Sequence, residues 1–182
     1  DTETYLTAIQ KSGKGKRSIA NIAPRNTALY SSFAFDSFET FHENFEILKK
    51  EKTEEFKSYT TQITEIENLL DINIKKNVYS WIGNEVALIH FNSSLSKNKK
   101  DIAAIFKTSD IKDATENLNF ILSKIKEKTP LKFKQIPYKN HTINFLDLKG
   151  FFKIVAGNMF KKMEKPYFTI IDDFVVFSAS PN

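Results

Sequence analysis

The chain has 182 residues, 41% of them hydrophobic and 17 of them Phe, which suits one domain with a packed core and excludes a wholly disordered chain. It contains no Cys, which excludes disulfides and thiolate sites, and it has no apolar run of the roughly 18 residues that span a bilayer. The net charge of +5 comes from 27 basic residues, of which only Arg17 and Arg25 are Arg, so base and phosphate recognition by an Arg cluster is disfavoured and nucleic acid is an unlikely partner.

The N-terminal segment is basic and rich in small residues. The stretch "KSGKGKRS", residues 11–18, matches no phosphate-binding loop, because Gly13 and Gly15 lack the required spacing. Small polar residues and glycine cannot bury a core. We therefore expect a flexible basic linker over residues 1–18, followed by one domain over residues 19–182.

A strand followed by helices opens this domain. Residues 28–35 are rich in strand formers, and Asp36, with Glu39 three residues later, is spaced as a helix-capping box. Apolar residues then recur at helical spacing. They are Phe38, Phe41, Phe45, Leu48, Phe56, Tyr59, Ile63, Ile66 and Leu70. The interval of eight between Leu48 and Phe56 fits one long helix with a stutter or two helices that meet near residues 49–55.

Hairpins dominate the middle of the chain. Residues 77–83 predict a short turn in which Gly83 supplies a positive φ. Residues 85–91 and 101–108 predict an antiparallel hairpin, and residues 131–136 and 141–148 predict a second one with its turn at 137–140. Between them, Ser109 or Asp110 would cap a helix with one apolar stripe. The stripe is Ala114, Leu118, Ile121, Leu122 and Ile125.

The last third predicts a helix and a third hairpin. Residues 151–165 favour a helix broken near Gly157, and residues 166–180 favour a hairpin with Asp172 and Asp173 at its turn. Ser180 and Pro181 are typical of a helix start. We therefore expect this chain to be the N-terminal part of a longer protein. Strand-to-cap junctions at Asp36, Ser109 and Ser180 fit either an internal duplication or ordinary alternation of strands and helices.

This order of elements predicts an α+β fold: an antiparallel sheet with helices packed on one face, built from ferredoxin-like elements with added hairpins.

The stretch "WIGNEVALIHFN", residues 81–92, holds the first candidate binding residues. Trp81 and Glu85 combine an aromatic platform with a carboxylate, although one carboxylate lacks the partner that acid–base catalysis needs. We therefore favour an architectural turn, in which Trp81 anchors the chain and Glu85 is a capping or solvated residue. His90 lies in an apolar strand, where a histidine with one hydrogen bond is the expected state.

The adjacent Asp172 and Asp173 are the other candidate binding residues. Paired carboxylates serve glycoside chemistry or bind divalent cations, but neighbours in a strand point to opposite faces, so hairpin-turn residues explain them better. The three His residues lack metal-ligand spacing, and no serine lies in a nucleophile elbow. We predict no catalytic residue, no metal site and no cofactor.

A family resemblance adds to this interpretation. The stretches "IAPRNTALYSSFAFDSFETF" and "WIGNEVALIHF", together with the later "DDFVVFSAS", resemble an uncharacterised bacterial family of exported proteins that is catalogued as a domain of unknown function. The element W-[IL]-G-[ND]-E-[VA]-A corresponds to Trp81–Ala87. The resemblance implies an exported protein of the periplasm or cell envelope, and it supplies no catalytic residues.

Two classes of function follow. The first is a non-enzymatic envelope module that binds a protein, a peptide or a lipid. The second is an enzyme or small-ligand-binding domain whose pocket is completed by a C-terminal portion of the longer protein.

Overall fold

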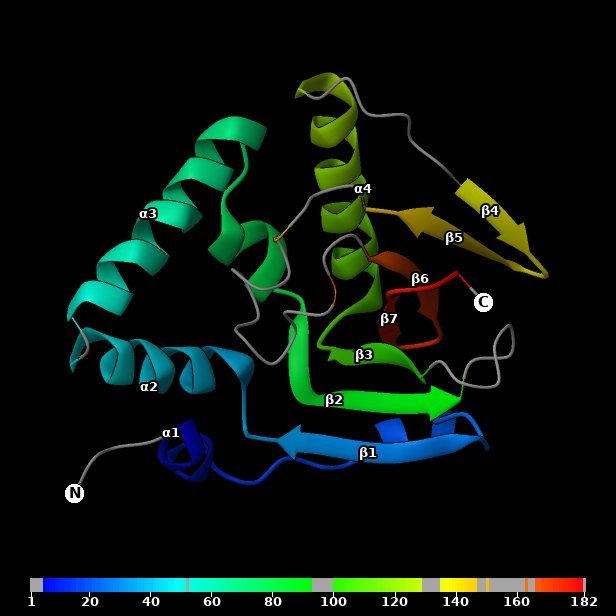
Figure 1. The fold of residues 1–182 in the computed structure, drawn as a ribbon, viewed down its shortest axis with the longest axis horizontal. Helices are drawn as coiled ribbons and strands as arrows, with labels where there is room; N and C mark the ends of the chain where they lie inside the picture. The colour runs from blue at the N-terminus through cyan, green and yellow to red at the C-terminus, as the bar shows by residue number, and fades with distance from the viewer. Residues whose placement is uncertain are drawn as a thin grey trace.

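The computed structural model describes residues 5–51, 53–92, 100–128, 135–146, 150, 163 and 166–181 (Figure 1). Its helical elements are α1 (Tyr5–Lys11), the 3-10 helix η1 (Ile19–Ile22), α2 (Phe38–Glu51), α3 (Thr53–Leu70), the π-helical turn η2 (Lys75–Tyr79) and α4 (Ile111–Lys128). Its strands are β1 (Thr27–Ala34), β2 (Ile82–Asn92), β3 (Lys100–Thr108), β4 (Gln135–Tyr138), β5 (His141–Phe145), β6 (Tyr167–Ile171) and β7 (Phe174–Ser178).

The strands form one seven-stranded sheet in the order β1-β2-β3-β7-β6-β5-β4, and every neighbouring pair is antiparallel. The three predicted hairpins form as β2–β3, β4–β5 and β6–β7. The turn predicted over residues 137–140 is too long, because Pro137 and Tyr138 belong to β4 and pair with Thr142 and His141. Since four antiparallel steps separate β3 from β4, these two strands run parallel and are joined through α4. This is a split β-α-β arrangement, the unit of ferredoxin-like folds, with extra strands inside it. The predicted fold class is confirmed.

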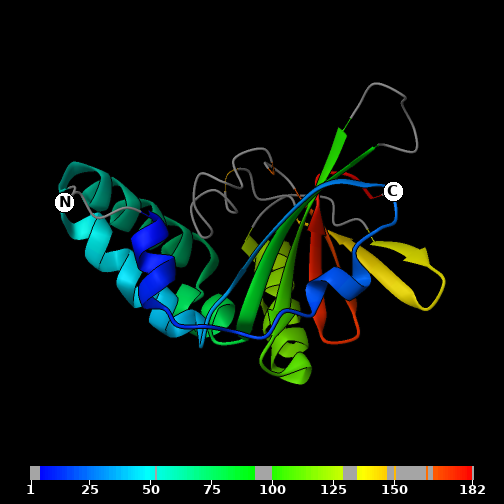
Figure 2. The ribbon, with the colours of Figure 1, turned by 90° about the horizontal axis from the view of Figure 1, so that it is seen from below.

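The main core lies between the sheet and the helices. It joins Phe35, Phe38 and Phe41 to Trp81 and Phe106, and it includes the buried stripe of α4. A smaller cluster lies on the opposite face, where Ile19 packs on alternate residues of β2 and β3, namely Ala87, Ile89 and Ile105. Figure 2 shows η1 on the side of β1–β3 that faces away from α2 and α3. Among the described residues, helices therefore cover one face of the sheet, and the short helix η1 packs on the other.

The long apolar repeat forms two helices, α2 and α3, which meet at an angle (Figure 1). The start of α2 differs from the predicted capping box. The Ser37 hydroxyl accepts the Thr40 backbone N–H at 3.1 Å and caps the helix. Asp36 instead accepts the Lys14 backbone N–H at 3.2 Å. The spacing of Asp36 and Glu39 was misleading because the carboxylate is used by a segment distant in sequence.

Helix α4 begins as its sequence predicts. Asp110 Oδ1 accepts the backbone N–H groups of Lys112 at 2.7 Å and Asp113 at 3.1 Å, which satisfies two of the donors that a helix N-terminus leaves unpaired. All five predicted stripe residues are buried, from Ala114 to Ile125.

The N-terminal segment differs from the expected flexible linker. Residues 5–11 form α1, and residues 12–18, which we term the N-terminal strap, are hydrogen bonded to the domain. Ser12 is buried, and its carbonyl accepts the Asp36 N–H at 2.8 Å. A Cβ on Gly15 would lie 2.4 Å from the Phe35 carbonyl oxygen. Glycine is therefore used in the strap for close backbone packing rather than for flexibility.

The helix expected over residues 151–165 lies outside the described residues, apart from Met163. Within the part of the chain that the structure describes, no helix has the length and apolarity that crossing a membrane requires.

Candidate functional site

Trp81 anchors the main core at the entrance to β2. Its indole N–H donates to the Asn77 carbonyl at 3.0 Å, and its ring packs edge-to-face on Phe106 with centroids 6.4 Å apart. The side chain is 1% exposed, so it offers no platform to a ligand. The architectural interpretation of Trp81 therefore agrees with its position.

Gly83 serves a different purpose from the one predicted. The φ angle of Gly83 is not positive. A Cβ at this position would lie 2.9 Å from the Lys107 carbonyl oxygen and equally close to the Thr108 backbone. The strand is irregular here, because Ile82 pairs with Thr108 while Val86 pairs with Phe106. Glycine is required because two backbones approach closely at this bulge.

Glu85 is the most unusual residue of the motif, since it is a carboxylate with 0% exposure. Its Oε2 accepts the backbone N–H groups of Ser18 at 2.5 Å and Ile19 at 2.9 Å, and the Ser18 hydroxyl at 3.2 Å. The Tyr30 hydroxyl lies 3.4 Å from Oε1. Glu85 therefore holds the end of the N-terminal strap and the start of η1 against the sheet. The predicted capping role agrees with these bonds, whereas the alternative of a solvated residue is wrong because the side chain is buried.

The five predicted binding residues do not converge. Trp81 lies in the main core, whereas Glu85 faces the opposite side of the sheet with Ala87 and Ile89. His90 is half-buried further along β2, opposite Leu29 and Ile102. Asp172 and Asp173 are exposed in the β6–β7 turn, where Asp172 has φ +49°. The hairpin-turn interpretation of this pair agrees with the structure, and a binding role for any of the five stays a prediction.

A buried aromatic cluster joins α2, α3 and the π-helical turn. The hydroxyls of Tyr59 and Tyr79 lie 3.2 Å apart, and the Tyr79 ring lies 4.3 Å from the His42 ring between centroids. Burial raises the pKa of Tyr79 well above its ordinary value of 10.0, and the neighbouring Tyr59 adds to this effect. Burial also raises the pKa of Tyr59. Both hydroxyls therefore stay protonated at neutral pH, which suits a structural hydrogen bond.

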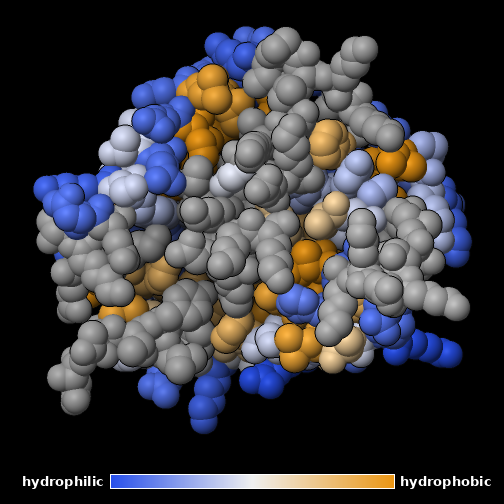
Figure 3. Space-filling model, viewed as in Figure 1, coloured by the Kyte–Doolittle hydropathy of each residue, from blue (hydrophilic) through white to orange (hydrophobic). Residues whose placement is uncertain are grey.

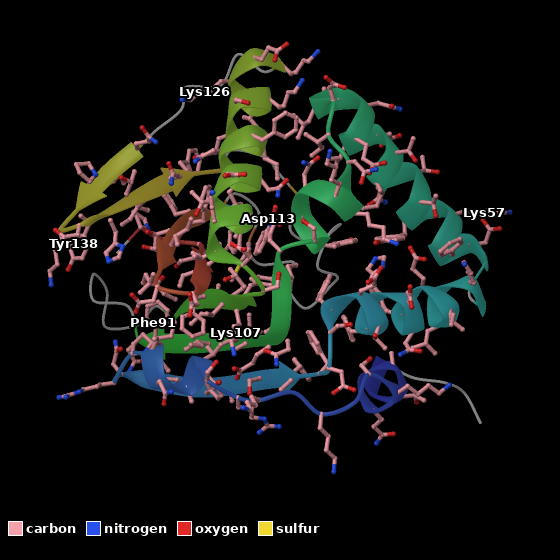
Figure 4. The ribbon with its side chains drawn as sticks, turned by 180° about the vertical axis from the view of Figure 1, so that it is seen from behind. Lys57, Phe91, Lys107, Asp113, Lys126 and Tyr138 are labelled. Atoms are coloured by element: carbon pink, nitrogen blue, oxygen red, sulfur yellow. The ribbon has the colours of Figure 1, made fainter. Side chains whose placement is uncertain are left out.

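A polar cleft lies at the other end of the sheet, between α4 and strands β4–β6. Its volume is about 300 Å³. The described residues that line it are Thr115, Asn119, Gln135, Asn140, His141, Thr142, Asn144, Thr169 and Ile170. Four of them carry side-chain amides and three carry hydroxyls, whereas Ile170 alone is aliphatic. Tyr138, which is 58% exposed, pairs with His141 and lies at the tip of the hairpin beside this cleft (Figure 4).

The cleft coincides with a short ladder between β5 and β6. In the described part of β5, Asn144 and Phe145 are the residues that pair with β6, at Phe168 and Tyr167. Figure 2 shows the β4–β5 hairpin extending away from β6 and β7. Side chains replace the backbone ladder where the strands separate: the Thr169 hydroxyl donates to the Thr142 carbonyl at 3.1 Å, and His141 Nδ1 lies 2.9 Å from the Ile170 carbonyl oxygen.

These bonds determine which groups remain available to a ligand. Since a carbonyl oxygen only accepts, Nδ1 of His141 is the donor of its bond to Ile170. Gln135 donates to Asn144 at 2.9 Å, so these two amides orient each other. Among the described residues, the side-chain amides of Asn119 and Asn140 have no hydrogen-bond partner. They are donors and acceptors that a ligand can use.

The sequence analysis did not predict the cleft, because none of its lining residues belongs to a recognisable motif. Local patterns predict a hairpin over residues 131–148 and leave His141 as one of three scattered histidines. The available signal was the density of uncharged polar side chains in "QIPYKNHTIN", together with Thr115 and Asn119 one turn apart on α4. Within the described part of the chain, no group of three or more His, Asp or Glu residues could hold a metal ion.

The chain matches one protein family over almost its whole length. Residues 3–182 match the family model described as Protein of unknown function (DUF3352). The chain belongs to this family. No curated protein and no solved structure matches it. The resemblance to a family of unknown function is thereby confirmed for the DUF3352 chain, while its bacterial and exported character and its W-[IL]-G-[ND]-E-[VA]-A motif stay predictions.

Proposed function

We propose that this DUF3352 protein is a non-enzymatic binding module that takes an uncharged, hydroxyl-rich ligand, of the chemistry of a saccharide, in the cleft between α4 and β4–β6. The main support for this proposal is the lining of the cleft. Its described residues combine four amides, three hydroxyls and one imidazole with a single aliphatic side chain. Saccharide hydroxyls both donate and accept hydrogen bonds, as amides do.

The charge of the lining favours binding over catalysis. His141 is the one titratable side chain among the nine described lining residues, and its Nδ1 is already engaged by Ile170. General acid–base catalysis requires a second group within hydrogen-bond distance of the reacting atoms. A peptide ligand would also favour apolar anchor pockets, which this lining does not supply. The hypothesis of a pocket completed by a further portion of the protein stays a prediction.

An exported, envelope-associated location belongs to the same proposal. Its support is the resemblance carried by Pro24–Tyr30 and Trp81–Ala87, and an envelope is rich in saccharide polymers.

Thermal-shift measurements test the cleft. The panel contains cell-wall saccharides, divalent metals, fatty acids, nucleotides and short peptides, each at low and moderate salt. A bound ligand raises the melting temperature according to its saturation. We expect a saccharide to raise it equally at both salt concentrations, because the saccharide carries no charge.

Two variants locate the effect. Asn119→Ala removes an unengaged amide and should weaken binding about tenfold, since an unpaired polar contact costs roughly 1–2 kcal/mol. Gln62→Ala removes an exposed helical amide on α3 and should leave affinity unchanged. A ligand that binds both variants equally, or a panel in which only nucleotides or metals bind, would overturn the assignment.

A further inference from the structure

The N-terminal strap is a fixed element with cationic side chains. Its first residue, Ser12, is bonded to Asp36 through the backbone, and its last, Ser18, is held by Glu85. Gly13 has φ +78° and faces the Asp36 carboxylate, where no Cβ would fit. The strap is thus tied to the domain at both ends and closely packed near its middle, so the fold sets the backbone positions from which its side chains project.

The side chains that this backbone presents are positively charged. Residues 11–17 contain Lys11, Lys14, Lys16 and Arg17 and no acidic residue, and all four are exposed. Lys14, Lys16 and Arg17 form no ion pair with a carboxylate in the described part of the chain. Figure 4 shows nitrogen-tipped side chains projecting beyond the strap and β1, and Figure 3 shows hydrophilic residues along the same lower rim.

Two carboxylates, Asp36 and Glu85, are hydrogen bonded to the backbone of the strap and count against its cations. Glu85 is buried under Ser18 and Ile19, and Asp36 accepts the Lys14 N–H. Lys107, on the outer face of β3, adds a further cation near this end of the sheet. The exposed Asp172 and Asp173 lie beyond β3, in the β6–β7 turn that contacts Thr108. The rim formed by the strap therefore carries an excess of positive charge.

We propose that the N-terminal strap is an electrostatic docking surface for an anionic lipid bilayer. Clusters of Lys and Arg are attracted to anionic lipid headgroups without specific geometry, which suits a strap that presents two Lys and one Arg. Nucleic-acid recognition favours several Arg side chains or a basic track interleaved with aromatic residues, and the strap has neither. This surface is independent of the proposed saccharide cleft.

The position of the strap is compatible with simultaneous use of the cleft. The strap lies along the β1–β2 edge, and the cleft lies at β4–β6, close to the opposite edge. Three to six strand spacings of roughly 4.8 Å separate them, on the order of 15–30 Å. A strap seated on a bilayer would therefore leave the cleft open to the aqueous side.

Vesicle co-sedimentation of the whole chain tests this proposal. The vesicles are pure phosphatidylcholine or an equal mixture of phosphatidylcholine and phosphatidylglycerol, at low ionic strength and at ~0.15 M salt, where screening acts over about 8 Å. We expect binding to the anionic vesicles alone and a strong loss at the higher salt. The variant Lys14→Gln/Lys16→Gln/Arg17→Gln should lose about fivefold in affinity per cation, about 100-fold in all.

A matched variant separates the strap from net charge. Lys57→Gln/Lys139→Gln/Arg25→Gln removes the same charge and residue types from other exposed positions. It should bind within a few fold of the unmodified chain, and both triple variants should keep its melting temperature, since the six side chains are exposed. The proposal fails if the two triple variants lose affinity equally, or if anionic vesicles do not bind. It also fails if a duplex oligonucleotide competes the protein off the vesicles at equal charge concentration, which would assign the strap to nucleic acid.

Discussion

Three residues of the Trp81–Ala87 segment stabilise the fold, each through a different interaction. Trp81 fills the core and satisfies its indole donor on Asn77. Gly83 allows two strands to approach, because a Cβ would contact the Lys107 carbonyl. The Glu85 carboxylate accepts the first backbone N–H donors of η1, as an N-cap side chain does. Unlike an N-cap residue, Glu85 lies 67 positions from Ser18 in the sequence. Family members that share this segment are therefore expected to share the strap geometry.

Replacing Glu85 should destabilise the protein. Glu85→Ala leaves two buried backbone N–H groups unpaired, and we expect a loss of about 2–4 kcal/mol in the free energy of unfolding. Glu85→Gln keeps one acceptor oxygen and should lose less. Urea denaturation measures both variants, with the exposed Glu116→Gln as a control that should change little. Equal stability of Glu85→Ala and Glu116→Gln would show that the buried carboxylate does not hold the strap.

The paired tyrosines predict a stability change at alkaline pH. The folded-state pKa values of Tyr59 and Tyr79 are raised above the ordinary value of 10.0, chiefly by burial. The stability they contribute is complete below pH 10.0 and is lost as the pH rises further, because the unfolded chain ionises first. When urea midpoints are measured below and above pH 10.0, the midpoint of the unmodified chain should therefore decrease more steeply with pH than that of Tyr79→Phe. The exposed Tyr138→Phe should retain the steep fall, and an identical slope in all three proteins would contradict this account.

At the scale of elements, regular periodicity was predictive and long-range contacts were not. The stripe of α4 and the three hairpins follow from local spacing and turn residues, so the sequence predicts them. The strap was mistaken for a solvated linker because its fixed position comes from Glu85 and Asp36, which no local pattern reveals. The cleft was missed for the same reason, since its residues come from α4 and from three strands.

Helix α4 offers a test of a local interaction. Asp110→Ala removes the side chain that caps its first turn and should reduce the free energy of unfolding by about 1 kcal/mol. Asp110→Asn keeps an accepting oxygen and should restore most of the loss. Chemical denaturation distinguishes these outcomes. If the Asn variant were as unstable as the Ala variant, the charge of Asp110 at the helix dipole, rather than its hydrogen bonds, would be the stabilising factor.

For the whole molecule, one sheet separates three regions with different chemistry. The helical face holds the main core, the β1–β2 edge carries the cationic strap, and the opposite end carries the uncharged cleft. This separation suits a module that attaches at one edge and binds a ligand at the other.

The proposed envelope location can be tested by cell fractionation. Fractionation of cells that express the native gene should recover the protein with the envelope at low salt, and a high-salt wash should release part of it, because the strap attraction is screened. A periplasmic marker and a cytosolic marker serve as controls. Recovery of the protein only with the cytosolic marker would exclude the envelope proposal.

The binding cleft is the central claim, and nuclear magnetic resonance tests it most directly. Titration of the isotopically labelled chain with the saccharide that stabilises it best should shift the side-chain amide signals of the cleft. These signals belong to Asn119, Gln135, Asn140 and Asn144, whereas those of Asn26 and Gln62 should stay in place. Shifts centred on the strap or on the Trp81–Ala87 segment, with the cleft signals unmoved, would contradict the account and place ligand binding elsewhere.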